Sequence, residues 1–160
     1  MKNILLVLTI ASLMVCCDKD NYIDSGIHEQ KHDCTVWEYF HTDRANWDSL
    51  IVMIEHAGMI KYFDGTNKDE ITILAPTNHS INQYLFQTLD DNGERLHEKV
   101  TDIPADECRE MLLSYMIHGK KFLEDFDHEV KGTQTGGTME QALSGIHLRV
   151  YRITSSFYDI

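Results

Sequence analysis

The sequence predicts an α+β domain, because strand-like and helix-like apolar patterns occur together in one short chain. The clearest strand is the β-branched, apolar run at residues 71–74. It should end at Pro76, which has no backbone N–H to donate to a sheet. A helix is expected directly afterwards, since Thr77 and Asn78 can cap a helix N-terminus. Alternating apolar and polar side chains at residues 146–150 predict another strand with one buried face.

Three more helices are predicted from capping residues and helical spacing. Thr35 and Glu38 are spaced as a capping box, so a short helix should begin there. A second helix should end at Gly58, and a third should begin at Pro104 and continue to near Gly119. The apolar faces comprise Trp47, Leu50, Ile51 and Ile54 in the second helix, and Ala105, Cys108, Leu112 and Tyr115 in the third.

The N-terminus has the pattern of an export signal. Lys2 precedes an uncharged apolar run at residues 4–15, which is short for a membrane span and typical of a signal-peptide core. The cysteines that follow resemble a bacterial lipoprotein box. Cys17 is the expected lipidation site, because cleavage then falls after the small residue Cys16. The alternative is an ordinary secreted protein with two incidental cysteines.

This pattern divides the chain into three parts. We expect a signal peptide at residues 1–16, a flexible lipid-anchored tether at 17–33, and one domain at 34–160. The acidic residues after Cys17 resemble the surface-export signals of Bacteroidetes lipoproteins. The expected location is therefore the cell envelope, anchored by lipid to the outer membrane and exposed at the surface.

The charge of the chain excludes some classes of partner. It has 26 Asp and Glu residues against 14 Lys and Arg, which gives a formal charge of −12. This charge repels the phosphates of nucleic acids and anionic lipid surfaces. We expect no nucleic-acid partner, and contact with a membrane only through the lipid anchor.

Several motifs, in order along the chain, resemble those of the fasciclin (FAS1) family. The strand that ends in Ala75, Pro76, Thr77 and Asn78 is similar to the first family motif. Other segments resemble the opening helices, the Leu-Leu-x-Tyr helix with its following Gly-Lys, and the Thr-Leu-x-Gly-x-x-Leu-x-Val strand: residues 35–40, 47–59, 111–115, 119–120 and 142–150. The resemblance implies a wedge of β-sheet packed with several short helices. It also implies a non-enzymatic adhesion or binding module with a protein or glycan ligand and no cofactor.

Two departures from the family pattern matter. Met116 stands where the family has a histidine after its tyrosine, so the adhesion roles of that pair do not carry over. The family also closes with further strands, whereas this sequence stops at Ile160. We therefore expect the C-terminal strands to be missing and the strand at residues 146–150 to lack a neighbour. An open sheet edge of this kind would favour self-association.

One short motif suggests metal chemistry. His28, Glu29 and His32 match HExxH, in which two histidines one helical turn apart bind zinc and the glutamate acts as a base. That chemistry needs a helix in the wall of a cleft and a third ligand. Here the motif lies in the polar tether, so we expect no metal site and no catalytic residues. A zinc hydrolase remains the third functional alternative.

Four further residues are candidates for the site or for a crosslink. Cys34 and Cys108 could form a disulfide outside the cytoplasm. Otherwise Cys108 is a small core residue. Tyr151, on the outward side of its strand, and His118 are the candidate surface contacts. Tyr115, Trp37 and Trp47 are expected to be packed in the core.

The sequence therefore predicts a cell-envelope lipoprotein whose fasciclin-like domain binds a protein or glycan. An accessory role in polysaccharide capture is one form that this binding could take. The alternative is a structural envelope protein that assembles with other proteins and binds no sugar.

Overall fold

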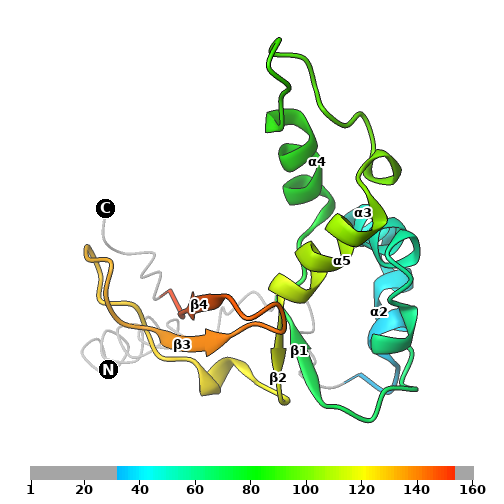
Figure 1. Ribbon diagram of the computed structural model, residues 1–160. Helices are drawn as coiled ribbons and strands as arrows, with labels where there is room; N and C mark the ends of the chain where they lie inside the picture. Colours follow the sequence, from blue (N-terminus) through cyan, green and yellow to red (C-terminus); the bar gives the residue numbers. More distant parts are fainter. Residues whose placement is uncertain (1–31, 154–160) are drawn as a thin grey trace, which may run out of the picture. The chain divides into compact units, whose positions relative to one another are not determined.

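The computed structural model describes residues 32–153 of the 160-residue chain. From Asp33 onward these residues belong to one compact unit, built of helices and short antiparallel strands (Figure 1). This confirms the α+β class. The elements are α2 (Val36–Thr42), α3 (Arg44–His56), η1 (Ile60–Tyr62), β1 (Ile71–Ile73), α4 (Asn78–Gln87), η2 (Val100–Asp102), α5 (Ala105–Ser114), β2 (Met116–His118), η3 (Leu123–Asp125), β3 (Thr138–Gln141) and β4 (His147–Val150).

The predicted capping box begins α2. The Thr35 hydroxyl accepts the Glu38 backbone N–H at 3.2 Å, and the Glu38 carboxylate accepts the Thr35 N–H at 2.8 Å. Two backbone donors at the helix start are thereby satisfied. The predicted second helix is α3, whose buried side is formed by Leu50, Ile51, Met53 and Ile54. It packs against α2, α4, α5 and η2, so it is the central helix of the unit.

The start of α4 confirms one predicted cap and corrects the other. Thr77 is the N-cap, and its hydroxyl accepts the backbone N–H three residues further on. Asn78 instead joins two helices. Its Oδ1 accepts the Ser49 N–H at 2.7 Å, and its Nδ2 donates to the carbonyls of Arg44 at 3.0 Å and Ala45 at 2.8 Å. The first turns of α3 and α4 are thus fixed together.

The prediction that the third helix continues to near Gly119 is wrong. Helix α5 ends at Ser114, and Met116–His118 forms strand β2, which pairs antiparallel with β1. Alternation along β2 sends Met116 and Ile117 to opposite faces of the sheet, and both are fully buried. A helix continued through these residues could not bury both side chains on opposite faces of one sheet.

The predicted strand at residues 146–150 is confirmed as β4, but it does not lack a neighbour. It pairs antiparallel with β3, from Thr138 opposite Val150 to Gln141 opposite His147. The expectation that the strand at residues 146–150 lacks a neighbour is therefore wrong, because β3 pairs with one of its edges. Strand β3 was missed because its half-buried residues are Thr138 and Glu140, which give no apolar alternation.

A single junction joins the two strand pairs. Ile117 of β2 bridges to Ala142 just after β3, and the Leu143 N–H donates to the Met116 carbonyl at 2.8 Å. The structure therefore has two separate two-stranded pairs, β1–β2 and β3–β4, which meet where β2 lies beside the end of β3 (Figure 1).

Two groups of buried side chains lie on opposite faces of these strands. The main core contains the buried faces of α2, α3, α4 and α5 together with Met116 of β2. Ile117, Phe126 and Ala142 are also buried but do not belong to that core. In residues 32–153, no helix is long and apolar enough to cross a membrane.

Candidate binding surface

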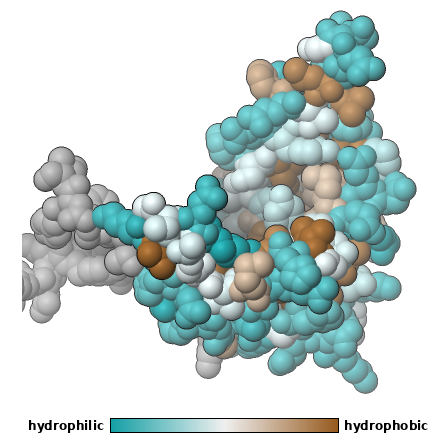
Figure 2. Space-filling model, turned by 60° about the vertical axis from the view of Figure 1, so that its left-hand side comes forward, coloured by the Kyte–Doolittle hydropathy of each residue, from teal (hydrophilic) through white to brown (hydrophobic). Residues whose placement is uncertain are grey.

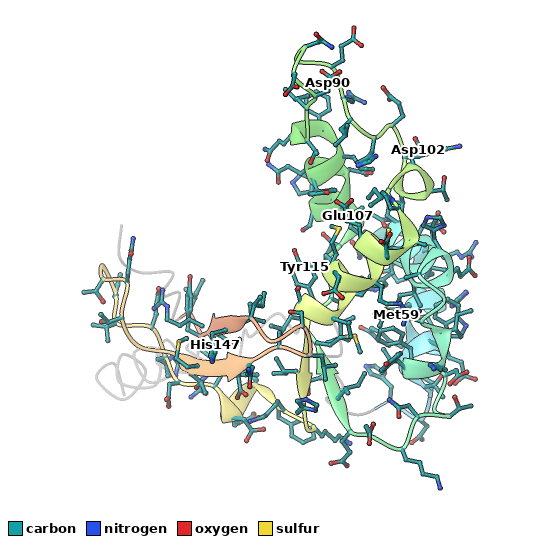
Figure 3. The ribbon with its side chains drawn as sticks, in the orientation of Figure 1. Met59, Asp90, Asp102, Glu107, Tyr115 and His147 are labelled. Carbon is teal, nitrogen blue, oxygen red and sulfur yellow. The ribbon has the colours of Figure 1, made fainter. Side chains whose placement is uncertain are left out.

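One side of the β3–β4 pair carries exposed side chains that could contact a ligand. Side chains alternate along a strand, so residues at every second position share a face. On one face lie Met139, Gln141, His147, Arg149 and Tyr151, which we call the open sheet face. Met139 is 61% exposed and Tyr151 39% exposed. Figure 3 labels His147 on β4.

The opposite side of β3–β4 is covered by the segment that follows β2. Lys121 Nζ lies 2.9 Å from Glu140 Oε1, and the Glu140 side chain is only 15% exposed. The Asp127 N–H donates to the Thr138 hydroxyl at 2.9 Å. Phe126, the residue before Asp127, is buried. The two faces of the hairpin are therefore distinct, and only one of them is open.

The position of Tyr151 is set by an arginine and a glycine. The Arg149 guanidinium carbon lies 4.9 Å from the Tyr151 ring centroid, which is within cation–π range. Arg149 Nη1 also donates to the Gly136 carbonyl at 3.2 Å. Gly137 has φ +77°, and a Cβ there would lie 2.7 Å from Tyr151 Cβ. The same Cβ would lie 2.8 Å from the Val150 carbonyl oxygen, so glycine permits the close approach of the chain at Val150 and Tyr151 to Gly137.

His118 lies on the other strand pair. It is exposed at the end of β2, opposite Ile71, and no hydrogen bond, ion pair or ring contact joins it to Tyr151 in the described residues. His118 is one residue beyond the Ile117–Ala142 bridge, whereas Tyr151 follows the far end of β4. The two predicted contacts are therefore at different places.

Met139 and Gln141 were not predicted as site residues. Their strand has no apolar alternation, so only the outward position of His147, Arg149 and Tyr151 on the next strand was predictable. The missed pair supplies an apolar side chain and an amide. With them, the open sheet face offers an imidazole, a guanidinium, an amide and a phenol around a small apolar surface.

The charge is distributed unevenly along the chain. Residues 32–115 contain 16 Asp and Glu against six Lys and Arg, a formal charge of −10. Residues 116–153 contain five of each, a formal charge of zero. The open sheet face therefore belongs to the part of the chain that has no formal net charge.

A second exposed surface lies at the end of α4, at residues 86–96, which we call the hairpin arm. Phe86, Leu89 and Leu96 are 63%, 52% and 54% exposed, and an apolar group is visible beside the hydrophilic tip at the top of Figure 2. Arg95 stacks 4.2 Å from the Phe86 ring centroid. Exposed apolar side chains grouped beside polar residues are a feature of protein contact surfaces.

The turn of the hairpin arm is well ordered by hydrogen bonds. Asp90, labelled in Figure 3, accepts the backbone N–H groups of Glu94 and Asn92, both at 2.9 Å. These bonds lower the pKa of Asp90 below its usual 3.8. The carboxylate therefore stays ionised at neutral pH and holds the turn.

The candidate metal and cysteine residues do not form a site in the described part of the chain. His28, Glu29 and Cys17 lie outside residues 32–153. Within that range, no group of three or more His, Cys, Asp or Glu side chains could hold a metal ion. Cys34 is exposed and Cys108 is buried, and the structure joins neither to another cysteine of the described residues. The disulfide between them stays a prediction. Burial raises the pKa of Cys108, as for a core thiol.

Two of the three aromatic residues that were expected in the core pack against it. Trp37 and Trp47 are half-buried and pack against the main core, as predicted. Tyr115 was expected in the core but is 40% exposed. It follows the last residue of α5 instead of lying on its buried face.

A family model described as the fasciclin domain matches residues 45–158. The chain belongs to the fasciclin family. Domains of this family are generally non-enzymatic adhesion or binding modules, and they occur in extracellular or surface proteins. No match was found among curated proteins.

Replacing Gly137 by alanine should distort the open sheet face. Gly137 and Gly132 both have positive φ, but a Cβ at Gly132 meets nothing within 4 Å. Gly132→Ala should therefore cost about 1 kcal/mol of backbone strain, and Gly137→Ala about 1–3 kcal/mol more through its clash with Tyr151. Denaturant unfolding of both variants measures the difference. Equal losses would show that the close contact at Gly137 does not constrain Tyr151.

Proposed function

We propose that this protein is a lipid-anchored fasciclin module of the bacterial cell envelope that binds a surface glycan through the open sheet face. Its role would be accessory to polysaccharide capture, and it would catalyse no reaction. The observation that carries the proposal is the asymmetry of β3–β4, where one face is covered by residues 119–127 and the other is exposed. A covered face stabilises the hairpin, while the open one is available for contact.

The chemistry of the open sheet face suits a glycan. Arg149, His147 and Gln141 carry planar or fixed hydrogen-bonding groups, which can pair with hydroxyls. Tyr151 adds an aromatic ring with a polar tip, and Met139 adds an adaptable apolar surface. A neutral sugar chain also avoids the repulsion that the acidic residues 32–115 would exert on an anionic ligand.

The second candidate is a structural envelope protein that assembles with other proteins. The hairpin arm supports this alternative, because Phe86, Leu89 and Leu96 are exposed on an ordered turn. An ordered apolar surface loses little conformational entropy when a partner binds. A glycan-binding result separates the two candidates, since the assembly protein binds no sugar.

Glycan binding should depend on Tyr151 and Arg149. A glycan array probed with the full chain should give bound polysaccharides, and Tyr151→Ala or Arg149→Ala should weaken binding about 10-fold, equivalent to about 1.4 kcal/mol. Tyr115→Ala is the matched control, because Tyr115 is 40% exposed and Tyr151 is 39% exposed. It should bind as the wild type does. Equal losses in Tyr115→Ala and Tyr151→Ala, or no bound glycan at all, would contradict the proposal.

The lipid anchor is expected on Cys17. Cells grown with a fatty-acid analogue should label the wild-type protein and leave Cys17→Ala unlabelled, because the thiol that receives the lipid is absent. Cys16→Ala serves as the control and should remain labelled. Labelling of Cys17→Ala with loss in Cys16→Ala would move the site by one residue. The absence of label in all three proteins would reject the lipid anchor.

A further inference from the structure

A small hollow lies in the connection between η1 and β1, at residues that belong to neither the open sheet face nor the hairpin arm. Its volume is about 260 Å³. It is lined by Lys61, Tyr62, Thr66, Asn67 and Asp69. This volume is slightly below the range of roughly 300–1,000 Å³ for drug-sized ligands. A single small ring therefore fits the hollow better than an extended chain.

The wall of the hollow is held by contacts with the rest of the domain. Tyr62 is half-buried and packs against the main core. The Thr66 hydroxyl lies 2.6 Å from Asp64 Oδ1, and the same oxygen accepts the Thr66 N–H at 2.9 Å. The carbonyl of Phe63, the residue before Asp64, accepts the Trp37 N–H at 3.0 Å. The hollow is therefore formed before any ligand arrives.

Four lining residues have hydrogen-bonding groups that remain available to a ligand. They are the Lys61 ammonium, the Tyr62 hydroxyl, Asn67 Nδ2 and the Asp69 carboxylate. Within residues 32–153, none of these four groups makes a hydrogen bond or an ion pair. Asn67 Oδ1 accepts the Asp69 N–H at 3.2 Å, which engages the amide oxygen and leaves its nitrogen as a donor.

The charges and polarity of these groups define the class of ligand. The lining residues carry one ammonium and one carboxylate, and the Asp64 carboxylate lies directly behind Thr66, so an anionic ligand would gain no net attraction. Hydroxyls can both donate and accept, and they therefore match this mixture of donors and an acceptor. The Lys61 ammonium lies 5.9 Å from the centroid of the half-buried Tyr62 ring, so these two side chains form one wall of the hollow and leave the Tyr62 hydroxyl as a polar group at its edge. We propose that this hollow binds one neutral sugar residue.

This site deepens the proposed function, because it adds a second contact for the same class of ligand. It rests on the proposed function only for the ligand class, and it involves none of the residues of the open sheet face. A chain of sugars held at two sites gains avidity if it can span them. The two sites can be tested separately, since different variants remove each one.

Titration of the full chain with neutral hexoses, followed by amide NMR, tests the site directly. A ligand of this size with few contacts should bind with a dissociation constant on the order of millimolar. At least one hexose should give saturable shifts at residues 60–70. Tyr62→Phe removes only the hydroxyl, and Asn67→Asp replaces the donor with an acceptor of the same shape. Each should weaken binding at least 3-fold while leaving the melting temperature nearly unchanged.

Controls separate this site from the open sheet face. Arg149→Ala should leave the hexose shifts at residues 60–70 unchanged, even where it reduces polysaccharide binding. Glycine tests a zwitterionic ligand and glucuronate an anionic one. Each should bind more weakly than the hexose. The proposal is overturned if no hexose shifts these amides, if glycine or glucuronate binds more tightly, or if Tyr62→Phe and Asn67→Asp bind as the wild type does.

Discussion

The backbone junction between β2 and β3 determines how the β3–β4 hairpin is placed. The Leu143 N–H donates to the Met116 carbonyl, and the Ser144 N–H donates to the Leu113 carbonyl at 3.2 Å. These bonds join the β3–β4 hairpin to the end of α5 and to the strand that follows it. The Ser114 and Ser144 hydroxyls, 3.0 Å apart, add a side-chain contact at the same place. Without this junction, the hairpin would be held only by the segment that follows β2, through contacts such as Lys121 with Glu140 and the Arg152 N–H with the Asp127 carbonyl. A two-stranded pair is marginally stable alone.

Because the two strand pairs are joined at this junction, the buried core and the exposed hairpin are linked through β2. At β2, Met116 is fully buried in the main core, which the helices complete. On the β3–β4 hairpin beyond the junction, Met139 and Tyr151 are exposed. Burial at β2 fixes the register at the junction and therefore which residues of the hairpin face outward. The candidate site is thus positioned by the core without being part of it, which allows its side chains to vary without loss of the fold.

The sequence predicted those elements whose signals are local. The capping box at Thr35 and the cap at Thr77 depend only on residues a few positions away, and both were predictable. Strand β2 was not, because Met116 follows α5 with no glycine or proline between them and both belong to one apolar pattern. Strand β3 was not predicted either, since one of its inward residues is Glu140, whose burial depends on a distant lysine. The open sheet face could therefore be predicted only on its β4 side.

Native-state hydrogen exchange at the Leu143 and Ser144 amides tests the junction between the two strand pairs most directly. Amides that join a buried strand to a core helix should open only with the whole domain. We therefore expect both to exchange as slowly as the amide of Leu112 in the fully buried part of α5. Exchange at a much faster rate, close to that of the exposed Gly145 in the β3–β4 turn, would show that the hairpin opens independently. The open sheet face would then not be positioned by the helical core.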